Sequence, residues 1–117
     1  MKLQIEDQRL RFRISEAELT RLLAGTTLCD ETRLGPSEHR RRHLRLRPGA
    51  DPQLDWRDGQ ITLHLPRTAV EDYAAGLPRR DALRFTLDCA GEAVTLDFEV
   101  DVRDSVRTRL TSKAAPD

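Results

Sequence analysis

Apolar and polar residues alternate along several short segments of the chain, which is the pattern of strands that bury one face. Leu10, Phe12 and Ile14 alternate with three arginines, and a similar run, KLQIE, comes just before them across a short polar turn. Two such runs joined by a tight turn predict a β-hairpin with one apolar and one charged face.

A short helix is predicted to follow this hairpin directly. Ser15 and Glu18 have the spacing of a capping box, in which each side chain accepts a hydrogen bond from the other residue's backbone amide. Gly25 suits the left-handed conformation that ends many helices. The apolar stripe between these ends consists of Leu19, Leu22 and Leu23. We therefore expect a helix of about nine residues.

The same pattern occurs a second time. A shift of 51 residues takes Asp7 to Asp58 and Gly25 to Gly76, so that residues 58–76 lie on residues 7–25. The matched apolar positions are Leu10 with Ile61, Phe12 with Leu63, Ile14 with Leu65, Leu19 with Val70, Leu22 with Tyr73 and Leu23 with Ala74. Strand, helix and helix end all correspond, which indicates an internal repeat.

The remaining segments complete two similar halves, 1–47 and 53–103, joined by a linker rich in proline and glycine. Residues 26–34 read as an edge strand, the segment EHRRRHLRLR as a basic strand, and the segments 83–87 and 94–102 as a hairpin. The predicted fold is a single α+β domain over 1–104, a duplicated ββαββ unit whose mostly antiparallel sheet is curled or barrel-like and carries two short helices. Residues 105–117 are predicted to form a disordered tail.

Composition restricts the class of protein. The 117 residues include 20 basic and 20 acidic side chains, so the formal net charge is zero and any electrostatic partner must recognise a local patch. No apolar run is long enough for a signal peptide or a membrane span, so we expect a cytoplasmic protein with no membrane partner. Cys29 and Cys89 are too few for a disulfide scaffold and are expected to be small buried thiols.

The basic segment provides the candidate binding site. His39, Arg41, His43, Arg45 and Arg47 fall on one side of the predicted strand, whereas Leu44 and Leu46 fall on the other with two further arginines. A basic stripe of this kind can contact phosphates. Stacking residues have no obvious source, because the three phenylalanines fall on core-facing positions.

The last predicted strand carries an acidic ladder that could pair with the basic strand. Asp97, Glu99 and Asp101 alternate on its polar side. If the basic and acidic strands were neighbours, these residues would form cross-strand ion pairs. If the two strands lay apart, the domain would present one basic and one acidic surface, which favours self-association.

Catalytic and metal sites find little support in the sequence. His39, His43 and His64 are the available histidines, but a spacing of four on a strand does not bring two ligands together. Glu99, Asp101 and Arg103 loosely resemble the charged strand of the triphosphate tunnel phosphatases, in which such residues point into a barrel to hold metal and phosphate. No nucleophile elbow, phosphate loop or zinc-protease motif occurs. We expect no metal and no cofactor.

Three stretches resemble a family of small uncharacterised bacterial proteins: MKLQIEDQRLRFRISEAELTRLLAG, ETRLGP and DGQITLHLPRTAVEDYA. Members of that family open with a similar strand-strand-helix unit and carry a similar second strand and helix. The resemblance covers about half the chain and implies no activity, and the C-terminal DFEVDVRDS departs from the ending of that family.

The sequence therefore favours a small non-enzymatic module that contacts another protein or a second copy of itself through sheet edges. The alternative is binding of nucleic acid or another anionic ligand through residues 39–47. The second alternative is a metal-dependent triphosphate hydrolase.

Overall fold

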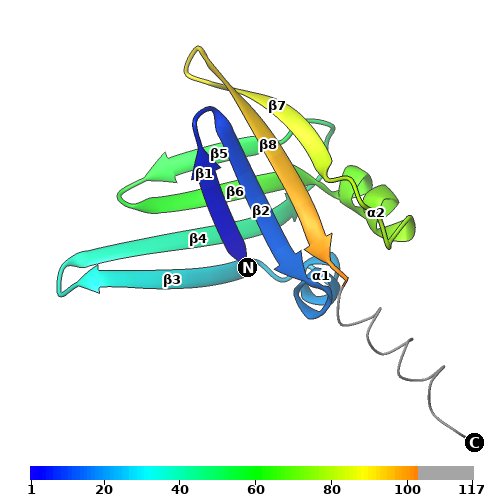
Figure 1. Cartoon of the computed structure of the whole chain (residues 1–117), viewed down its shortest axis with the longest axis horizontal. Helices are drawn as coiled ribbons and strands as arrows, with labels where there is room; N and C mark the ends of the chain where they lie inside the picture. The colour runs from blue at the N-terminus through cyan, green and yellow to red at the C-terminus, as the bar shows by residue number, and fades with distance from the viewer. Residues whose placement is uncertain (103–117) are drawn as a thin grey trace, which may run out of the picture.

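The computed structural model describes residues 1–102 of the chain, so the tail predicted at 105–117 lies outside the described residues. Strand, strand, helix, strand and strand follow one another twice (Figure 1), which confirms the duplicated ββαββ unit. The elements are β1 (Lys2–Glu6), β2 (Arg9–Ser15), α1 (Glu16–Leu23), β3 (Leu28–Gly35), β4 (Glu38–Arg47), β5 (Gln53–Arg57), β6 (Gln60–Pro66), α2 (Arg67–Ala75), β7 (Leu83–Cys89) and β8 (Glu92–Asp101).

The eight strands form two separate sheets of four. Sheet A has the order β1-β2-β8-β7, and sheet B has the order β3-β4-β6-β5. The outer pairings are antiparallel, whereas the central pairs, β2 with β8 and β4 with β6, are parallel. The sheets are not closed into a barrel, and the predicted sheet is divided into these two. Each helix carries the chain from one sheet to the other, and each sheet therefore receives one hairpin from each half and ends in two edge strands.

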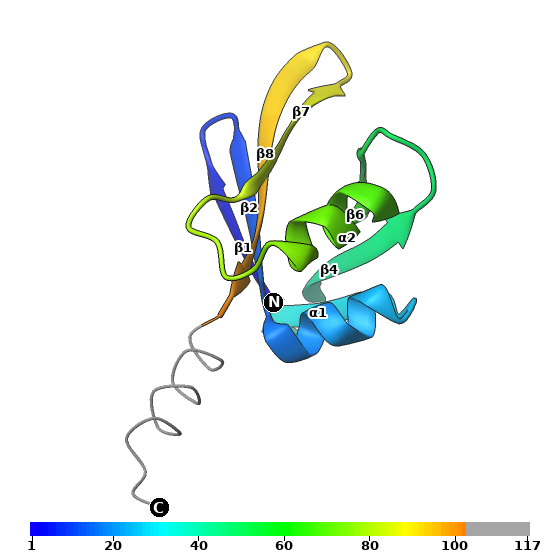
Figure 2. The ribbon, with the colours of Figure 1, turned by 90° about the vertical axis from the view of Figure 1, so that its right-hand side faces the viewer.

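The two halves exchange places between the sheets. The hairpin β1–β2 in sheet A corresponds to β5–β6 in sheet B, and β3–β4 in sheet B corresponds to β7–β8 in sheet A. In Figure 1 the strands of one sheet run across those of the other, with the hairpin turns of sheet A at the top and those of sheet B at the left. Figure 2 shows both helices beside the sheets at the end away from these turns.

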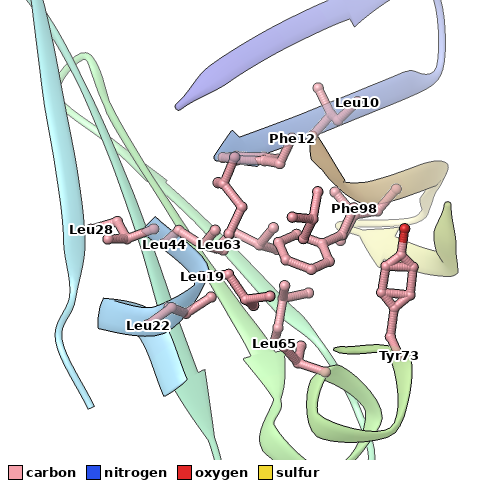
Figure 3. Packing of buried hydrophobic residues seen from close by; sticks show 14 of the residues in the cluster. Leu10, Phe12, Leu19, Leu22, Leu28, Leu44, Leu63, Leu65, Tyr73 and Phe98 are labelled. Atoms are coloured by element: carbon pink, nitrogen blue, oxygen red, sulfur yellow. The ribbon is translucent and has the colours of Figure 1, made fainter. Parts of the chain in front are cut away.

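The core lies between the sheets and beneath the helices. Phe12 and Phe98 of sheet A face Leu44 and Leu63 of sheet B, and all four side chains are fully buried (Figure 3). The six matched strand residues of the repeat are buried, namely Leu10, Phe12, Ile14, Ile61, Leu63 and Leu65. Both matched helices also bury their apolar stripes against this core. The predicted equivalence of the two segments is therefore confirmed.

Local signals in the sequence account for the turns and helix ends. The capping box forms as predicted, because the amide of Glu18 donates to Ser15 Oγ at 3.1 Å and the amide of Ser15 donates to Glu18 Oε1 at 3.0 Å. Asp58 and Gly59 both have positive φ, 50° and 75°, as a type I′ turn requires. A Cβ atom on Gly59 would lie 2.9 Å from the carbonyl oxygen of His39, so this turn approaches β4 too closely for a side chain.

Candidate functional site

Strand β4 presents its basic residues as the sequence predicts. Leu44 is fully buried against the core and Leu46 is partly buried, so the alternate residues point away from the core. The five predicted site residues therefore share the outer face of sheet B: His39, Arg41, His43, Arg45 and Arg47.

Neighbouring strands extend this surface into a grid of polar side chains. The cross-strand rows are Glu31–Arg41–Gln60–Arg57, Cys29–His43–Thr62–Asp55 and Arg45–His64–Gln53. Together with Arg33, His39 and Arg47 they make up what we call the basic face. It holds five arginines against two carboxylates, Glu31 and Asp55. Cys29 is exposed on this face rather than buried, because the position at the edge of the sheet leaves the thiol uncovered.

One carboxylate organises the end of the basic face near the β3–β4 turn. Glu31 accepts hydrogen bonds from Arg33 Nε at 2.9 Å and Arg41 Nε at 3.0 Å, and its Oε1 lies 2.8 Å from His39 Nδ1. These contacts, with that of Arg33 the largest, lower the pKa of Glu31 to about 2. The carboxylate therefore stays ionised and offsets part of the positive charge at this end.

The other end of the basic face keeps its positive charge. The side chain of Arg45 has no hydrogen-bond or ion-pair partner among residues 1–102 and is exposed. Arg47 donates only to the neutral Gln53 side chain, and His43 Nε2 lies 3.3 Å from Gln60 Oε1. Of the five predicted residues, Arg45 and Arg47 are thus the ones whose charge no carboxylate counters.

Sheet A shows a different arrangement on its own outer face. The acidic ladder of β8 lies beside Arg9, Arg11 and Arg13 of β2, with nitrogen–oxygen distances of 3.7–4.0 Å. Arg84 adds a two-pronged hydrogen bond to Asp97, at 2.7 and 3.2 Å. This outer face holds five cations and five carboxylates. They are Lys2, Arg9, Arg11, Arg13 and Arg84, and Glu6, Asp88, Asp97, Glu99 and Asp101.

The basic strand β4 and the acidic strand β8 are therefore not neighbours, and they lie in different sheets. The partner of the acidic ladder is the arginine ladder of β2, a pairing that the sequence analysis did not consider. Within residues 1–102, the carboxylates of β8 are thus countered by cations of their own sheet, and self-association stays a prediction. The basic face remains without a complementary ladder.

A hollow of about 540 Å³ lies over the hairpin β5–β6 beside the basic stripe. Its lining is mostly polar and consists of Gln53, Asp55, Trp56, Arg57, Asp58, Gln60 and Thr62. Asp55 accepts a hydrogen bond from Gln53 Nε2 at 2.9 Å and lies 3.0 Å from His64 Nε2, and the Gln53 contact is the main cause of the lowered pKa of Asp55. The hollow thus offers amide, hydroxyl, carboxylate and guanidinium groups next to uncompensated arginines.

Trp56 is a site residue that the sequence analysis missed. By register with Ile61 it belongs to the core side of β5, yet its side chain is 62% exposed and it lines the hollow. Strand β5 is an edge of sheet B, so a large side chain there can border both faces. The only available signal was its position two residues before the Asp58-Gly59 turn, where strands extend past the core.

The three histidines all lie on the basic face, His39 and His43 on β4 and His64 on the adjacent β6. Within residues 1–102 no three His, Cys, Asp or Glu side chains are grouped so that they could hold a metal ion. In the same part of the chain, neither helix has the length and apolar content needed to cross a membrane.

Comparison with known proteins gives one match. A family model described as a family of unknown function (DUF7009) matches residues 1–77, from β1 to the end of α2. The chain belongs to this family. The match includes β3, β4, β5 and β6 and therefore the complete basic face. The resemblance noted in the sequence to an uncharacterised family is thereby confirmed. No curated protein and no solved structure matches the chain.

Proposed function

We propose that this protein binds nucleic acid by contacting its phosphate backbone with the basic face of sheet B. The observation that carries this proposal is the difference between the two outer faces. On sheet A the five cations, four arginines and a lysine, are equal in number to the carboxylates, whereas on sheet B the arginines exceed the carboxylates by three. An excess of exposed arginine on one face of a neutral protein supports recognition of a polyanion by a local patch.

The side chains around the arginines favour nucleic acid over other anions. Contacts to phosphate and sugar in protein–nucleic acid complexes come from arginine together with glutamine, threonine and similar polar groups. Gln53 supplies such a group to Arg47, Thr62 lies beside His43 one row from Arg45, and Gln60 lies between Arg41 and Arg57. Alternate residues of a strand are about 6.8 Å apart, so β4 presents a linear row of cations along an extended chain of phosphates.

Fluorescence anisotropy with end-labelled oligonucleotides tests the proposal. Each phosphate contact contributes roughly 0.7–0.9 to the slope of log affinity against log salt, so three arginine contacts predict a loss of about 20- to 40-fold between about 50 and 200 mM salt. The double variant Arg45→Gln with Arg47→Gln should weaken binding and reduce the magnitude of the slope by about 1.4–1.8.

The matched control removes the same charge from sheet A. Lys2→Gln with Arg11→Gln should leave both the affinity and the slope unchanged, because these residues belong to a face where carboxylates balance the cations. Equal weakening by the two double variants would show that total charge, and not the basic face, governs binding. Absence of binding to RNA and DNA near 50 mM salt would overturn the proposal, and a dimer in light scattering under those conditions would favour the protein-interaction module instead.

A further inference from the structure

An exposed tryptophan beside a cationic surface has a specific use. Tryptophan is enriched at interaction surfaces, because its ring combines a large apolar area with a polar N–H group. Trp56 is 62% exposed and forms part of the hollow lined by Gln53, Asp55, Arg57 and Gln60. In single-strand binding proteins, an aromatic ring next to a positively charged groove is the platform on which a base stacks.

Trp56 lies diagonally across sheet B from the uncompensated arginines. Strands β4 and β5 are separated only by β6, which is about 10 Å across the sheet, and in register Trp56 lies opposite Ile61 and Arg42, three residues before Arg45. At about 3.3 Å per residue the offset along the strands is also about 10 Å, so the backbone positions of Trp56 and Arg45 are about 14 Å apart. A single strand whose phosphates follow Arg45 and Arg47 can therefore bring one of its next bases to Trp56 across Gln60 and Thr62 of β6.

We propose that Trp56 and the adjoining hollow hold an unpaired base of a single-stranded nucleic acid whose phosphates lie along Arg45 and Arg47. This inference rests on the proposed function and names its ligand more closely. The amides of Gln53 and Gln60 each carry donors and an acceptor, so they can meet the edge of any base and sequence preference should be weak. A duplex keeps its bases stacked inside the helix and cannot offer one to the hollow, so single strands bind more tightly than duplex.

The repeat provides an internal comparison for this position. A shift of 51 residues takes Ile5 to Trp56, and Ile5 is likewise exposed, at 58%, just before its own hairpin turn. Ile5 belongs to sheet A, whose outer face has as many carboxylates as cations, and its aliphatic side chain offers no ring for stacking. Of these two matched positions, the aromatic one is thus in sheet B, the sheet that carries the basic face.

Intrinsic fluorescence measures the contact directly, because Trp56 is the only tryptophan of the chain. The protein is titrated with unlabelled oligothymidylate, oligouridylate and a mixed-sequence DNA duplex of equal length. Saturable quenching by either single strand, with weaker binding of the duplex, is the expected result. The difference between the two homopolymers then shows whether DNA or RNA is preferred.

Variants separate stacking from charge. Stacking contributes about 1–3 kcal/mol per base, so Trp56→Ala should weaken single-strand binding by about 5- to 150-fold while it leaves the salt slope unchanged. Trp56→Phe should retain most of the affinity, and Ile5→Ala should bind like the parent protein. The side chain is largely in solvent, so these variants should keep the far-UV circular dichroism and the urea midpoint of the parent protein.

Two outcomes overturn the inference in distinguishable ways. Salt-sensitive anisotropy binding without tryptophan quenching, or with Trp56→Ala as tight as the parent, would remove the stacking role and leave backbone binding in place. Failure of every oligonucleotide to bind at low salt would remove the proposed function and this inference together.

Discussion

Replacement of Asp97 by asparagine should destabilise the protein more than any other single charge removal on sheet A. Its side chain is only 1% exposed, although it lies on the outer face, because Arg9 and Arg84 cover it. Arg84 donates two hydrogen bonds to the carboxylate, at 2.7 and 3.2 Å, and these are the main cause of its lowered pKa. A neutral amide cannot accept both bonds with the same strength.

The expected loss is about 2 kcal/mol, since hydrogen bonds to charged groups contribute roughly 1.5–3 kcal/mol and Arg84, which is 57% exposed, can regain water once it is released. Glu99→Gln is the matched control. Its contacts to Arg11 and Arg13 are longer, at 4.0 and 3.7 Å, and more exposed, so its loss should stay below about 1 kcal/mol.

Urea unfolding followed by far-UV circular dichroism is the assay, because the exposed Trp56 is a poor reporter of the core. A loss of about 2 kcal/mol corresponds to a midpoint lower by about 1 M for a domain of this size. If Asp97→Asn and Glu99→Gln lower the midpoint equally, or if neither does, the reasoning that burial and short bonds distinguish Asp97 is wrong.

The same pair predicts a dependence on pH. The pKa of Asp97 is lowered in the folded protein, so its ionised form stabilises the fold above the unfolded-state pKa of about 3.9. That stabilisation is lost as the pH falls through the lower folded-state pKa. The gap in unfolding free energy between the parent protein and Asp97→Asn should therefore be full at pH 7 and smaller near pH 3, whereas a gap that widens in acid would contradict the assignment.

Two further predictions concern the core and the basic face. Phe12→Ala and Leu63→Ala occupy matched, fully buried positions of the repeat and should cost about 3–5 and 2–5 kcal/mol in urea unfolding; a loss below about 1 kcal/mol at either would show that the halves do not share one core. Glu31→Gln releases Arg33, His39 and Arg41 from their common carboxylate and should tighten oligonucleotide binding several-fold in anisotropy, and unchanged or weaker binding would show that this end of the basic face takes no part.

Elements whose signal is local could be predicted from the sequence. Alternation of apolar residues located β2 and β6, and the Ser15–Glu18 box located the start of α1. The repeat could be recognised because equivalent strands and helices bury equivalent residues. The apolar patterns of the two segments therefore coincide after a shift of 51 residues. The five site residues on β4 were placed on one face for the same reason, since side-chain direction alternates along any strand.

Features that depend on distant pairing could not be predicted. The pairing of β2 with β8 brings together strands from opposite ends of the described chain, and no local pattern states that two strands lie parallel in the same sheet. The strand that pairs with the acidic ladder of β8 therefore follows only from the strand order of the sheet. Trp56 was missed because alternation assigns it to the core side, whereas β5 is an edge strand of sheet B and leaves the ring exposed.

The duplication allows the two outer faces to be compared position by position. Arg13 pairs with Glu99 in sheet A, and the residue equivalent to Arg13, His64, pairs with Arg45 in sheet B. Glu99 and Arg45 thus occupy the same position of the fold with opposite charge. In sheet A the neighbouring strand supplies the counter-charge and the ladder stabilises the sheet. In sheet B the neighbouring strand β6 is free of carboxylates, so Arg45 and Arg47 receive no counter-charge from it, and Glu31 of β3 counters only charges at the other end of the basic face. The fold accepts acidic residues at these positions, as β8 shows, but β4 carries arginines there. The positive charge of β4 is therefore available to a partner from outside the chain.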